Sequence, residues 1–238
     1  MILYAVASAV AVDIAQRSVA GYLSQPELRR YNSLTESARL DFLSGRVALK
    51  AAVRHYCSLP IHELAQVAVE NAPDGRPDVN QTGLYCSLAH SCGWGVGAAS
   101  AQPIGVDIER VSPRSVELLR YISDEAEREA AGSDNGGYAE LIARIWTLKE
   151  AVLKGMGIGL TVAPRQLTVR KAQGGRFLVE VSKSVASEPL VWNAHSYAVD
   201  GFCISVATRE EPHEQPHISW YHSPDVHTAV DALLSRRA

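Results

Sequence analysis

Strand-like and helix-like segments alternate along this 238-residue chain, and they occur on both sides of the Gln102–Pro103 junction. Segments with the two-residue period of a half-buried strand stand between segments with the 3.6-residue period of a helix. A domain usually holds about 100–200 residues, so one large domain or two small ones fit this length. We therefore expect an α/β fold with two lobes of similar size, residues 1–102 and residues 103–238.

The same periods predict the individual elements. Strands are expected at 2–12, 64–70, 84–100 (two strands joined by a turn at Gly93), 104–111, 166–170, 176–181, 191–199 and 202–208. Helices are expected at 34–57, with Thr35 as N-cap, near 114–131, at 138–156 and near 225–236. Residues 72–83 are rich in Pro, Gly, Asp and Asn and predict a long turn.

Composition excludes several classes of protein. Hydrophobic residues make up 47% and charged residues 21%, which excludes a disordered, collagen-like or coiled-coil chain. The formal net charge of −3 excludes a basic field over the whole protein, so we expect no nucleic-acid partner. No apolar run approaches the roughly 18–20 residues that a membrane span needs, so no membrane partner is expected either.

The N-terminal segment and the cysteines predict a cytoplasmic protein. Residues 1–12 end in small residues, as secretory signals do, but no Lys or Arg precedes Arg17 to supply a positive leader. The four cysteines contain no CxxC pair, and we expect them to be reduced thiols.

Asp107 and Glu109 are the first candidates for chemistry. In a strand they point to the same face, while Val106 and Ile108 point to the other. Two neighbouring carboxylates repel each other unless a cation neutralises them, and their hard oxygen atoms suit Mg²⁺. An ordinary solvated strand face is the alternative that spacing alone leaves open.

The helix at 138–156 supplies the second pair of candidates. Glu150 and Lys154 are four residues apart, on nearly the opposite face from the apolar Leu148 and Val152. Such a pair is equally typical of a surface helix, which it stabilises by about 0.3–0.5 kcal/mol. Glycines then follow at 155, 157 and 159, so the helix ends at a bend that either admits a ligand or is a simple C-cap.

Basic residues and a histidine precede these carboxylates. Arg46, Lys50 and Arg54 share one helical face, Arg76 lies in the turn that follows, and arginine suits phosphate contacts. A solvated helix face is the alternative. His90 lies on or near a strand, where a lone histidine is more often structural than catalytic. His213 and His217 are separated by Pro216 among others, which disfavours a helical zinc site.

The order of these segments resembles one enzyme family. PIGVDIERV (103–111) followed by WTLKEAVLKGMGIGL (146–160) resembles the 4′-phosphopantetheinyl transferase superfamily of the Sfp type, in its WxxKEA subgroup. The upstream segments FLSGRVALKAAV, DGRP and SLAHS match in the same order. The resemblance covers about residues 30 to 170. It has two departures: Ala89, where the family commonly has Ser, and Arg76, which replaces the usual Lys and keeps its charge.

This resemblance implies an α/β fold of the α+β type. The expected molecule is a pseudo-twofold monomer of two similar lobes, each with a small, mostly antiparallel sheet packed with a long helix, and with coenzyme A between the lobes. The implied reaction transfers 4′-phosphopantetheine from coenzyme A to a serine of an apo acyl or peptidyl carrier protein. It depends on Mg²⁺, or alternatively Mn²⁺, and releases adenosine 3′,5′-bisphosphate.

The resemblance also implies roles for single residues. Asp107, Glu109 and Glu150 would be the metal ligands, and Glu150 would also be the base, acting directly or through a metal-bound water. Lys154 would stabilise or protonate the departing phosphate. The coenzyme A contacts would come from Arg46, Lys50, Arg76, His90 and Lys154.

Two other readings remain open at this point. A catalytically inactive module of the same fold would bind carrier protein or coenzyme A without turnover. A coenzyme A-dependent acyltransferase would need an acyl-transfer base or nucleophile and no metal, which the paired carboxylates do not favour. The sequence does not show which carrier protein or pathway is served, nor the role of residues 209–238.

Overall fold

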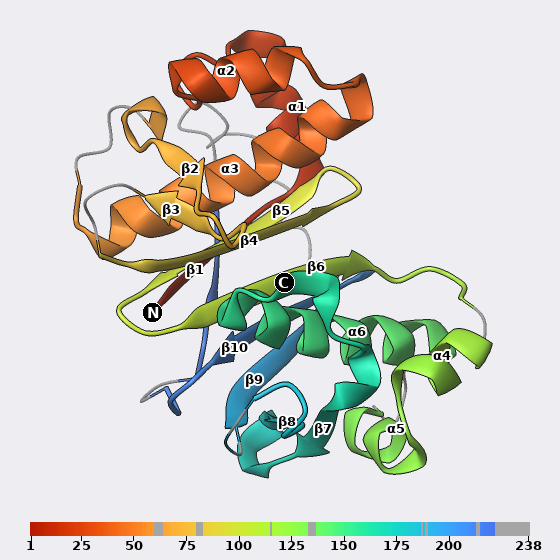
Figure 1. The fold of residues 1–238 in the computed structure, drawn as a ribbon. Helices are drawn as coiled ribbons and strands as arrows, with labels where there is room; N and C mark the ends of the chain where they lie inside the picture. Colours follow the sequence, from red (N-terminus) through yellow and green to blue (C-terminus); the bar gives the residue numbers. More distant parts are fainter. Residues whose placement is uncertain are drawn as a thin grey trace.

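The computed structural model describes residues 1–59, 64–79, 83–114, 116–132, 137–186, 188, 190–212 and 215–221. Its elements form two lobes, and each lobe has a sheet with a long helix packed against it (Figure 1). None of the described helices is both long enough and apolar enough to span a bilayer.

The sheet of the first lobe has the order β11-β1-β5-β4. Its antiparallel part contains β1 (Ile2–Val6), β4 (Tyr85–Ser91) and β5 (Trp94–Ser100), and β11 (Ile218–Trp220) pairs with β1 in parallel. Helix α3 (Glu36–Tyr56) packs against this sheet, with Val47, Ala48 and Ala51 fully buried. The chain therefore returns to the first lobe near its end, which its sequence does not predict.

The sheet of the second lobe is antiparallel throughout, in the order β6-β10-β9-β8-β7. Its strands are β6 (Ile104–Arg110), β7 (Leu167–Lys171), β8 (Phe177–Val181), β9 (Leu190–Val199) and β10 (Phe202–Thr208). Helix α6 (Tyr138–Met156) packs against it through an apolar stripe that includes Ile145, Leu148 and Val152.

The two lobes repeat one order of elements. A first strand (β1 or β6) leads to a long helix (α3 or α6), and a hairpin follows (β4–β5 or β9–β10). In both sheets the first strand pairs with the second strand of that hairpin. This repeat confirms the expected fold of two similar lobes. The boundary after residue 102 stays a prediction.

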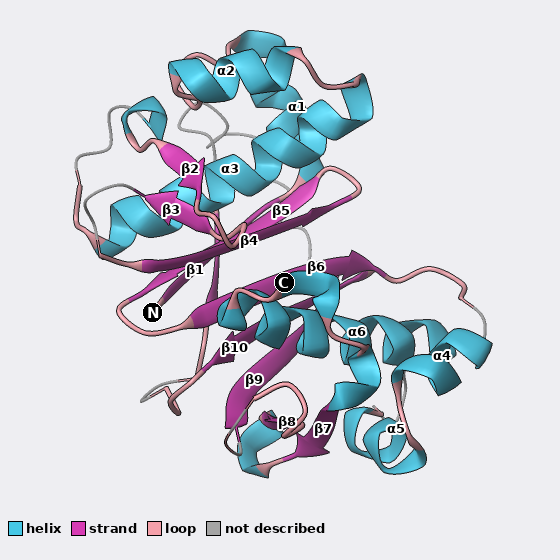
Figure 2. Cartoon of the chain, in the orientation of Figure 1, coloured by secondary structure: helices cyan, strands magenta, loops and turns pink. Residues whose placement is uncertain are grey.

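The lobes meet through an apolar layer between the two sheets. Leu3 and Ala5 of β1 contribute to it from the first sheet, and Val106 and Ile108 of β6 from the second. The helices consequently lie outside the strands of the two lobes (Figure 2). Because Val106 and Ile108 face the other lobe, the alternate positions of β6 face helix α6.

The remaining elements are short and decorate the two lobes. They are α1 (Ser8–Arg17), α2 (Gln25–Asn32), β2 (Val69–Asn71), β3 (Pro77–Val79), α4 (Val116–Ile122), α5 (Glu125–Ala131) and the 3₁₀ turns Leu64–Gln66, Gly159–Thr161, Pro164–Gln166 and Gln173–Gly175.

Several predicted elements are wrong in type or extent. The strand expected at 2–12 ends at Val6, and a helix begins at Ser8 with Val10 and Ile14 buried against the first lobe. The strand expected at 64–70 is a 3₁₀ turn followed by β2, and the turn at 72–83 contains β3.

The helix expected near 114–131 is two helices, because Asp124 is the N-cap of α5. Its side chain accepts a hydrogen bond from the amide of Glu127 at 2.8 Å. The helix expected near 225–236 lies outside the described residues, and so does His213 of the histidine pair.

Gly105 allows β6 to approach α6 closely, and a larger residue should not be tolerated there. A Cβ atom on Gly105 would collide with the backbone carbonyl oxygen of Ala151. We expect Gly105→Ala to lower the free energy of unfolding by at least about 3 kcal/mol, because backbone rather than a flexible side chain must move. Urea unfolding measures this, with Gly21→Ala as control, since that Cβ would meet nothing within 4 Å. Equal losses in the two variants would contradict the close approach.

Candidate active site

Asp107 and Glu109 lie on the face of β6 that is turned toward α6. Gly105, two residues earlier on this face, already contacts the α6 backbone. Asp107 is 5% exposed and Glu109 is half-buried. The two carboxylates therefore share one face, as their spacing predicts, but the face is enclosed and not solvated.

Helix α6 places Glu150 and Lys154 against these carboxylates. Glu150 is 7% exposed, so it is not part of a surface pair. Lys154 Nζ donates to Asp107 Oδ1 at 2.6 Å, across the interface between helix and strand. The lysine thus pairs with the carboxylate of β6, an interaction that the spacing within the helix cannot predict.

The three carboxylates affect one another's ionisation. Burial, and then the negative charges of Asp107 and Glu109, raise the pKa of Glu150 to about 7. Burial also raises the pKa of Asp107, with Lys154 opposing it. Burial and Asp107 raise the pKa of Glu109, with Arg114, 3.2 Å away, opposing them. These shifts describe a cluster of negative charge that is only partly neutralised.

A divalent cation fits the chemistry of this cluster. Asp107 Oδ2 is buried and has no hydrogen-bond partner among the described residues, so one strong acceptor stays unsatisfied. Carboxylate oxygens are the donors that Mg²⁺ and Mn²⁺ prefer. In the described part of the chain, no three His, Cys, Asp or Glu side chains are already arranged as a metal site. Asp107 and Glu109 instead pair with Lys154 and Arg114.

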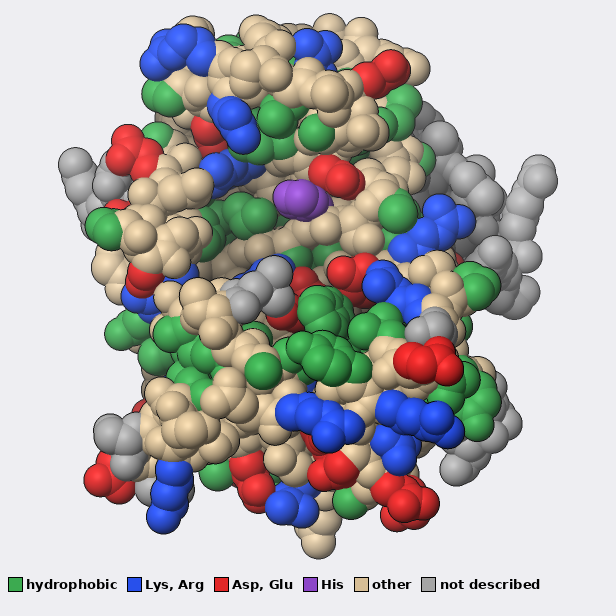
Figure 3. All heavy atoms as spheres, turned by 45° about the vertical axis from the view of Figure 1, so that its right-hand side comes forward, with side chains coloured by type: hydrophobic (Ala, Val, Ile, Leu, Met, Phe, Trp, Pro, Cys, Tyr) green, Lys and Arg blue, Asp and Glu red, His purple; other side chains and the backbone are tan. Residues whose placement is uncertain are grey.

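A cavity of about 570 Å³ lies beside the cluster, between the two lobes. Its wall includes Arg30, Arg46, Arg76 and His90 from the first lobe, and Lys154, Gly157 and Gly159 from the second. Figure 3 shows this face of the molecule with a hollow across its middle and charged side chains of both signs along it. Lys154 connects the cavity to the carboxylates, because its side chain lines the cavity and pairs with Asp107.

The predicted basic residues divide into two groups. Arg46 and Arg76 line the cavity as expected. Arg30 of α2 lines it too; it belongs to the same basic stretch of the sequence but not to the helical face of Arg46 and Lys50. Lys50 does not reach the cavity: its side chain is 0% exposed and pairs with Glu27 at 2.5 Å. We therefore no longer expect Lys50 to contact a ligand, because it already has a buried partner.

His90 lies at the cavity wall on β4. Its side chain is 45% exposed, and Nδ1 is 3.9 Å from a carboxylate oxygen of Asp41. Burial lowers the pKa of His90, while Asp41 opposes this. His90 and Leu88 face α3, so residues 87, 89 and 91 face the other lobe.

That alternation places Ala89 between the lobes. Ala89 is buried in the apolar layer between the sheets, where a hydroxyl group would face no cavity. On the same face, Ser87 Oγ accepts a hydrogen bond from the amide of Val106 at 3.0 Å. Ser87 and Ala89 therefore contribute to the contact between the two lobes. Ser87 also lines the cavity.

The end of α6 packs against the turn that carries Arg76. Gly157 is the C-cap, with φ +71°, a conformation that favours glycine. A Cβ atom there would lie 2.8 Å from Arg76 Nε and 3.0 Å from Asp74 Oδ2. Arg76 Nε donates to the same carboxylate oxygen at 2.7 Å. The absence of a side chain at Gly157 thus leaves room for the turn of the first lobe that contains Asp74 and Arg76, and both of these residues line the cavity.

Comparison with known proteins finds similarity to one family of transferases. The model of the 4′-phosphopantetheinyl transferase superfamily matches residues 103–207, the segment that carries Asp107, Glu109, Glu150 and Lys154. The 4′-phosphopantetheinyl transferase psf-1 of Bacillus pumilus is 26% identical over 184 residues, 76% of this chain and 75% of that protein.

Two further proteins match over shorter regions. Sfp of Bacillus subtilis (strain 168) is 26% identical over 60% of this chain and 63% of its own length, so this chain covers less than two thirds of that relative. A crystal structure of Helicobacter pylori holo-acyl-carrier-protein synthase in complex with coenzyme A matches 45% of this chain and 99% of that chain at 19% identity, with a TM-score of 0.32. Residues 103–207 of this chain therefore match the 4′-phosphopantetheinyl transferase superfamily, and the chain is similar to Sfp-type transferases at 26% identity.

Proposed function

We propose that this protein transfers the 4′-phosphopantetheine group of coenzyme A to a serine hydroxyl of an apo acyl or peptidyl carrier protein. The observation that carries the proposal is a carboxylate cluster that adjoins a cation-lined cavity between the lobes. Coenzyme A has an anionic diphosphate and 3′-phosphate at one end and a long pantetheine arm at the other. Arg30, Arg46 and Arg76 suit the phosphates, because guanidinium groups bind them in a bidentate way.

Asp107, Glu109 and Glu150 would hold Mg²⁺ or Mn²⁺, which would neutralise charge on the diphosphate as its bond breaks. The serine oxygen attacks the β-phosphorus, and the bond between that phosphorus and the bridging oxygen breaks. The electron pair leaves with adenosine 3′,5′-bisphosphate. Glu150 accepts the serine proton, directly or through a water.

Lys154 gives a testable prediction for the leaving group. It lies at the cavity wall and donates to Asp107, so its ammonium group would face the phosphate that acquires charge. We expect Lys154→Ala to lower kcat by about a hundredfold and to change the KM for coenzyme A much less, because the contact strengthens as charge develops. Steady-state kinetics measure this, with exposed Lys171→Ala of β7 as the control. A change confined to KM would make Lys154 a substrate clamp only.

A mass spectrum tests the proposed function directly. Apo carrier proteins from fatty-acid, polyketide and nonribosomal-peptide systems are incubated side by side with the protein, coenzyme A and Mg²⁺. A gain equal to one phosphopantetheine group, dependent on the metal, supports the proposal, and the carrier modified fastest identifies the partner. Transfer of an acyl group instead would indicate an acyltransferase. Binding of coenzyme A without any gain in mass would indicate an inactive binding module.

The remaining parts of the proposal concern the whole protein. We propose that it acts as a cytoplasmic monomer, with a lobe boundary after residue 102. The internal repeat of strand, helix and hairpin supports a monomer, because a single chain supplies both walls of the cavity.

A further inference from the structure

Each lobe contains a buried lysine that pairs with the glutamate of a helix capping box. In the first lobe, Lys50 Nζ of α3 donates to Glu27 Oε2 at 2.5 Å and to the carbonyl of Tyr22 at 2.9 Å. Glu27 Oε2 also accepts from the amide of Ser24 at 2.8 Å, where Ser24 is the N-cap of α2.

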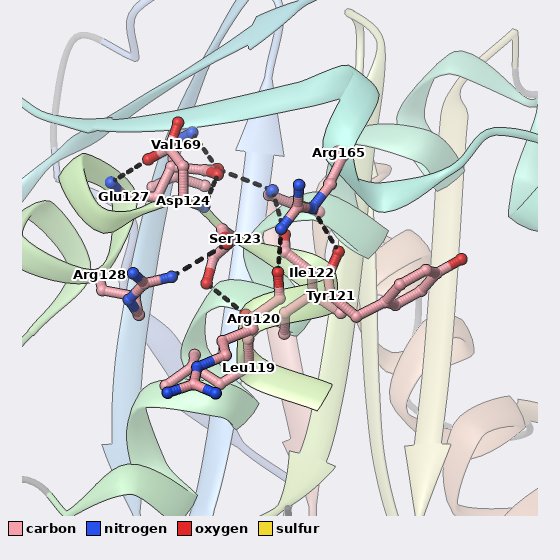
Figure 4. Close-up of polar contacts among 11 residues, drawn as sticks. Leu119, Arg120, Tyr121, Ile122, Ser123, Asp124, Glu127, Arg128, Arg165 and Val169 are labelled. Carbon is pink, nitrogen blue, oxygen red and sulfur yellow. Dashed lines mark hydrogen bonds and ion pairs between the residues drawn. The ribbon is translucent and has the colours of Figure 1, made fainter. Parts of the chain in front are cut away.

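The second lobe repeats this arrangement at the same spacing. Lys149 Nζ of α6 donates to the carbonyl of Ile122 at 2.6 Å and lies 2.7 Å from Glu127 Oε1. Glu127 Oε2 accepts from the amide of Asp124, the N-cap of α5, at 3.0 Å. Figure 4 shows Ile122, Asp124 and Glu127 at this position. In both lobes the carbonyl lies two residues before the N-cap, and the glutamate lies three residues after it.

The two glutamates differ in the use of Oε1. Glu127 Oε1 faces Lys149 and accepts from the amide of Val169 at 2.9 Å, so it is satisfied within the lobe. Glu27 Oε1 is buried without a hydrogen-bond partner in the described part of the chain, and it faces Arg46 Nε at 3.7 Å. Arg46 lies four residues before Lys50, and the residue four before Lys149 is the fully buried, apolar Ile145.

Arg46 lies at the cavity wall, and one nitrogen of its guanidinium group has no hydrogen-bond partner among the described residues. Its guanidinium carbon is 5.2 Å from the centre of the Phe42 ring, and Nη2 reaches Asn71 Oδ1 at 3.5 Å. The side chain is only 12% exposed, and Nη1 is buried with no hydrogen-bond partner among the described residues. One carboxylate, Glu27, thus faces two cations, Arg46 and Lys50, so within this trio of described residues the positive charges outnumber the negative by one.

We propose that Glu27 is a positioning residue that acts through Arg46. It faces Nε of the guanidinium group and so holds Arg46 at the cavity wall, where this cation meets the phosphates of coenzyme A. This inference rests on the proposed function for its ligand. It is independent of the metal cluster, because it concerns the first lobe only. Glu127 does not take this role, because its ion pair is with the buried Lys149, which is not among the residues that line the cavity.

The test separates positioning from stability with two matched pairs of variants. Glu27→Gln alone would leave Lys50 buried without a partner and destabilise the fold. The comparison is therefore between Lys50→Met, which keeps Glu27 opposite Arg46, and the double variant with Lys50→Met and Glu27→Gln. Lys149→Met with and without Glu127→Gln is the control pair in the second lobe.

We expect the double variant of the first lobe to bind coenzyme A about tenfold more weakly than Lys50→Met, the equivalent of about one charge-assisted hydrogen bond. Its kcat at saturating coenzyme A should equal that of Lys50→Met. The two variants of the second lobe should bind coenzyme A equally well. In a background that carries both Arg46→Met and Lys50→Met, Glu27→Gln should no longer change the affinity, because the effect passes through Arg46.

Calorimetry with inorganic pyrophosphate distinguishes failure of this inference from failure of the proposed function. Weaker binding of pyrophosphate in the double variant supports the role of Glu27 even if the wild-type protein modifies no carrier protein. Equal or tighter binding of pyrophosphate in the double variant overturns it. So does the absence of pyrophosphate binding by the wild-type protein.

Discussion

Asp107→Asn is expected to reduce transfer by at least about a thousandfold at ordinary Mg²⁺ concentration. Asn keeps the size of the side chain but loses the charge that would bind the cation, whose Lewis-acid effect is worth several kcal/mol. It also removes the ionic partner of Lys154, 2.6 Å away. Two roles are lost together, so we expect the effect to exceed that of Lys154→Ala.

Rates of carrier-protein modification, measured over a range of Mg²⁺ concentrations, check this expectation. Part of the lost rate should return at high Mg²⁺ if the main defect is metal affinity. Asp200→Asn is the matched control, because Asp200 is exposed and lies in the β9–β10 turn, at φ 47°, a conformation that Asn tolerates. A near-normal rate of Asp107→Asn at ordinary Mg²⁺ would remove Asp107 from the proposed metal site.

Glu150→Gln is expected to abolish transfer and to stabilise the metal-free fold at alkaline pH. The folded-state pKa of Glu150, about 7, lies above its ordinary value of 4.5. The folded protein therefore holds this proton more tightly than the unfolded chain does. Stability is lost as the pH rises from 4.5 through 7, by up to roughly 3 kcal/mol from this one group. Gln carries no charge, so the variant should escape this loss.

Urea unfolding in EDTA at pH 5.5 and pH 8 measures the effect. The free energy of unfolding of Glu150→Gln should exceed that of the wild type clearly at pH 8 and much less at pH 5.5, where Glu150 is mostly protonated. Glu129→Gln, on the exposed side of α5, should show no such dependence on pH. Mg²⁺ should restore stability to the wild type at pH 8 but not to the variant. A variant less stable than the wild type at pH 8 would show that the charge of Glu150 is already compensated in the fold.

Both predictions rest on negative charge that is buried and only partly neutralised in the fold. Asp107 has one oxygen on Lys154 and one without a hydrogen-bond partner among the described residues. Glu150 is buried beside two other carboxylates. Residues that hold a cation are expected to behave in this way when the cation is absent, because the repulsion that the cation relieves is then unopposed.

Local patterns in the sequence predicted some elements well and others poorly. The predicted strand 104–111 and helix 138–156 agree closely with β6 and α6, because their periodic segments are long and bounded by a Pro or by glycines. The prediction at 2–12 was wrong because an apolar run of this length suits a strand or a buried helix equally well. Asp124 divides the predicted helix at 114–131, and its capping box with Glu127 was a signal that periodicity alone did not use.

Buried ion pairs explain the errors at single residues. Lys50 shares a helical face with Arg46, so spacing treats them alike, yet one lies in the core and the other at the cavity. The partner of Lys50 is Glu27, 23 residues earlier, on another helix. Ser24 and Glu27 do have the spacing of a capping box, which could have placed the glutamate at a helix start. That spacing does not reveal that a lysine from α3 is buried against it.

The sequence by itself determined which residues share a face: Asp107 with Glu109 on a strand, and Glu150 with Lys154 on a helix, because the repeat of each element sets the direction of its side chains. Only the tertiary structure decided that these two faces meet, that Lys154 pairs with Asp107, and that Arg46 is held by Glu27 while Lys50 is withdrawn into the core. The physical reason is that periodicity acts over a few residues, whereas burial and ion pairing depend on which distant segments the packing of sheets and helices brings together.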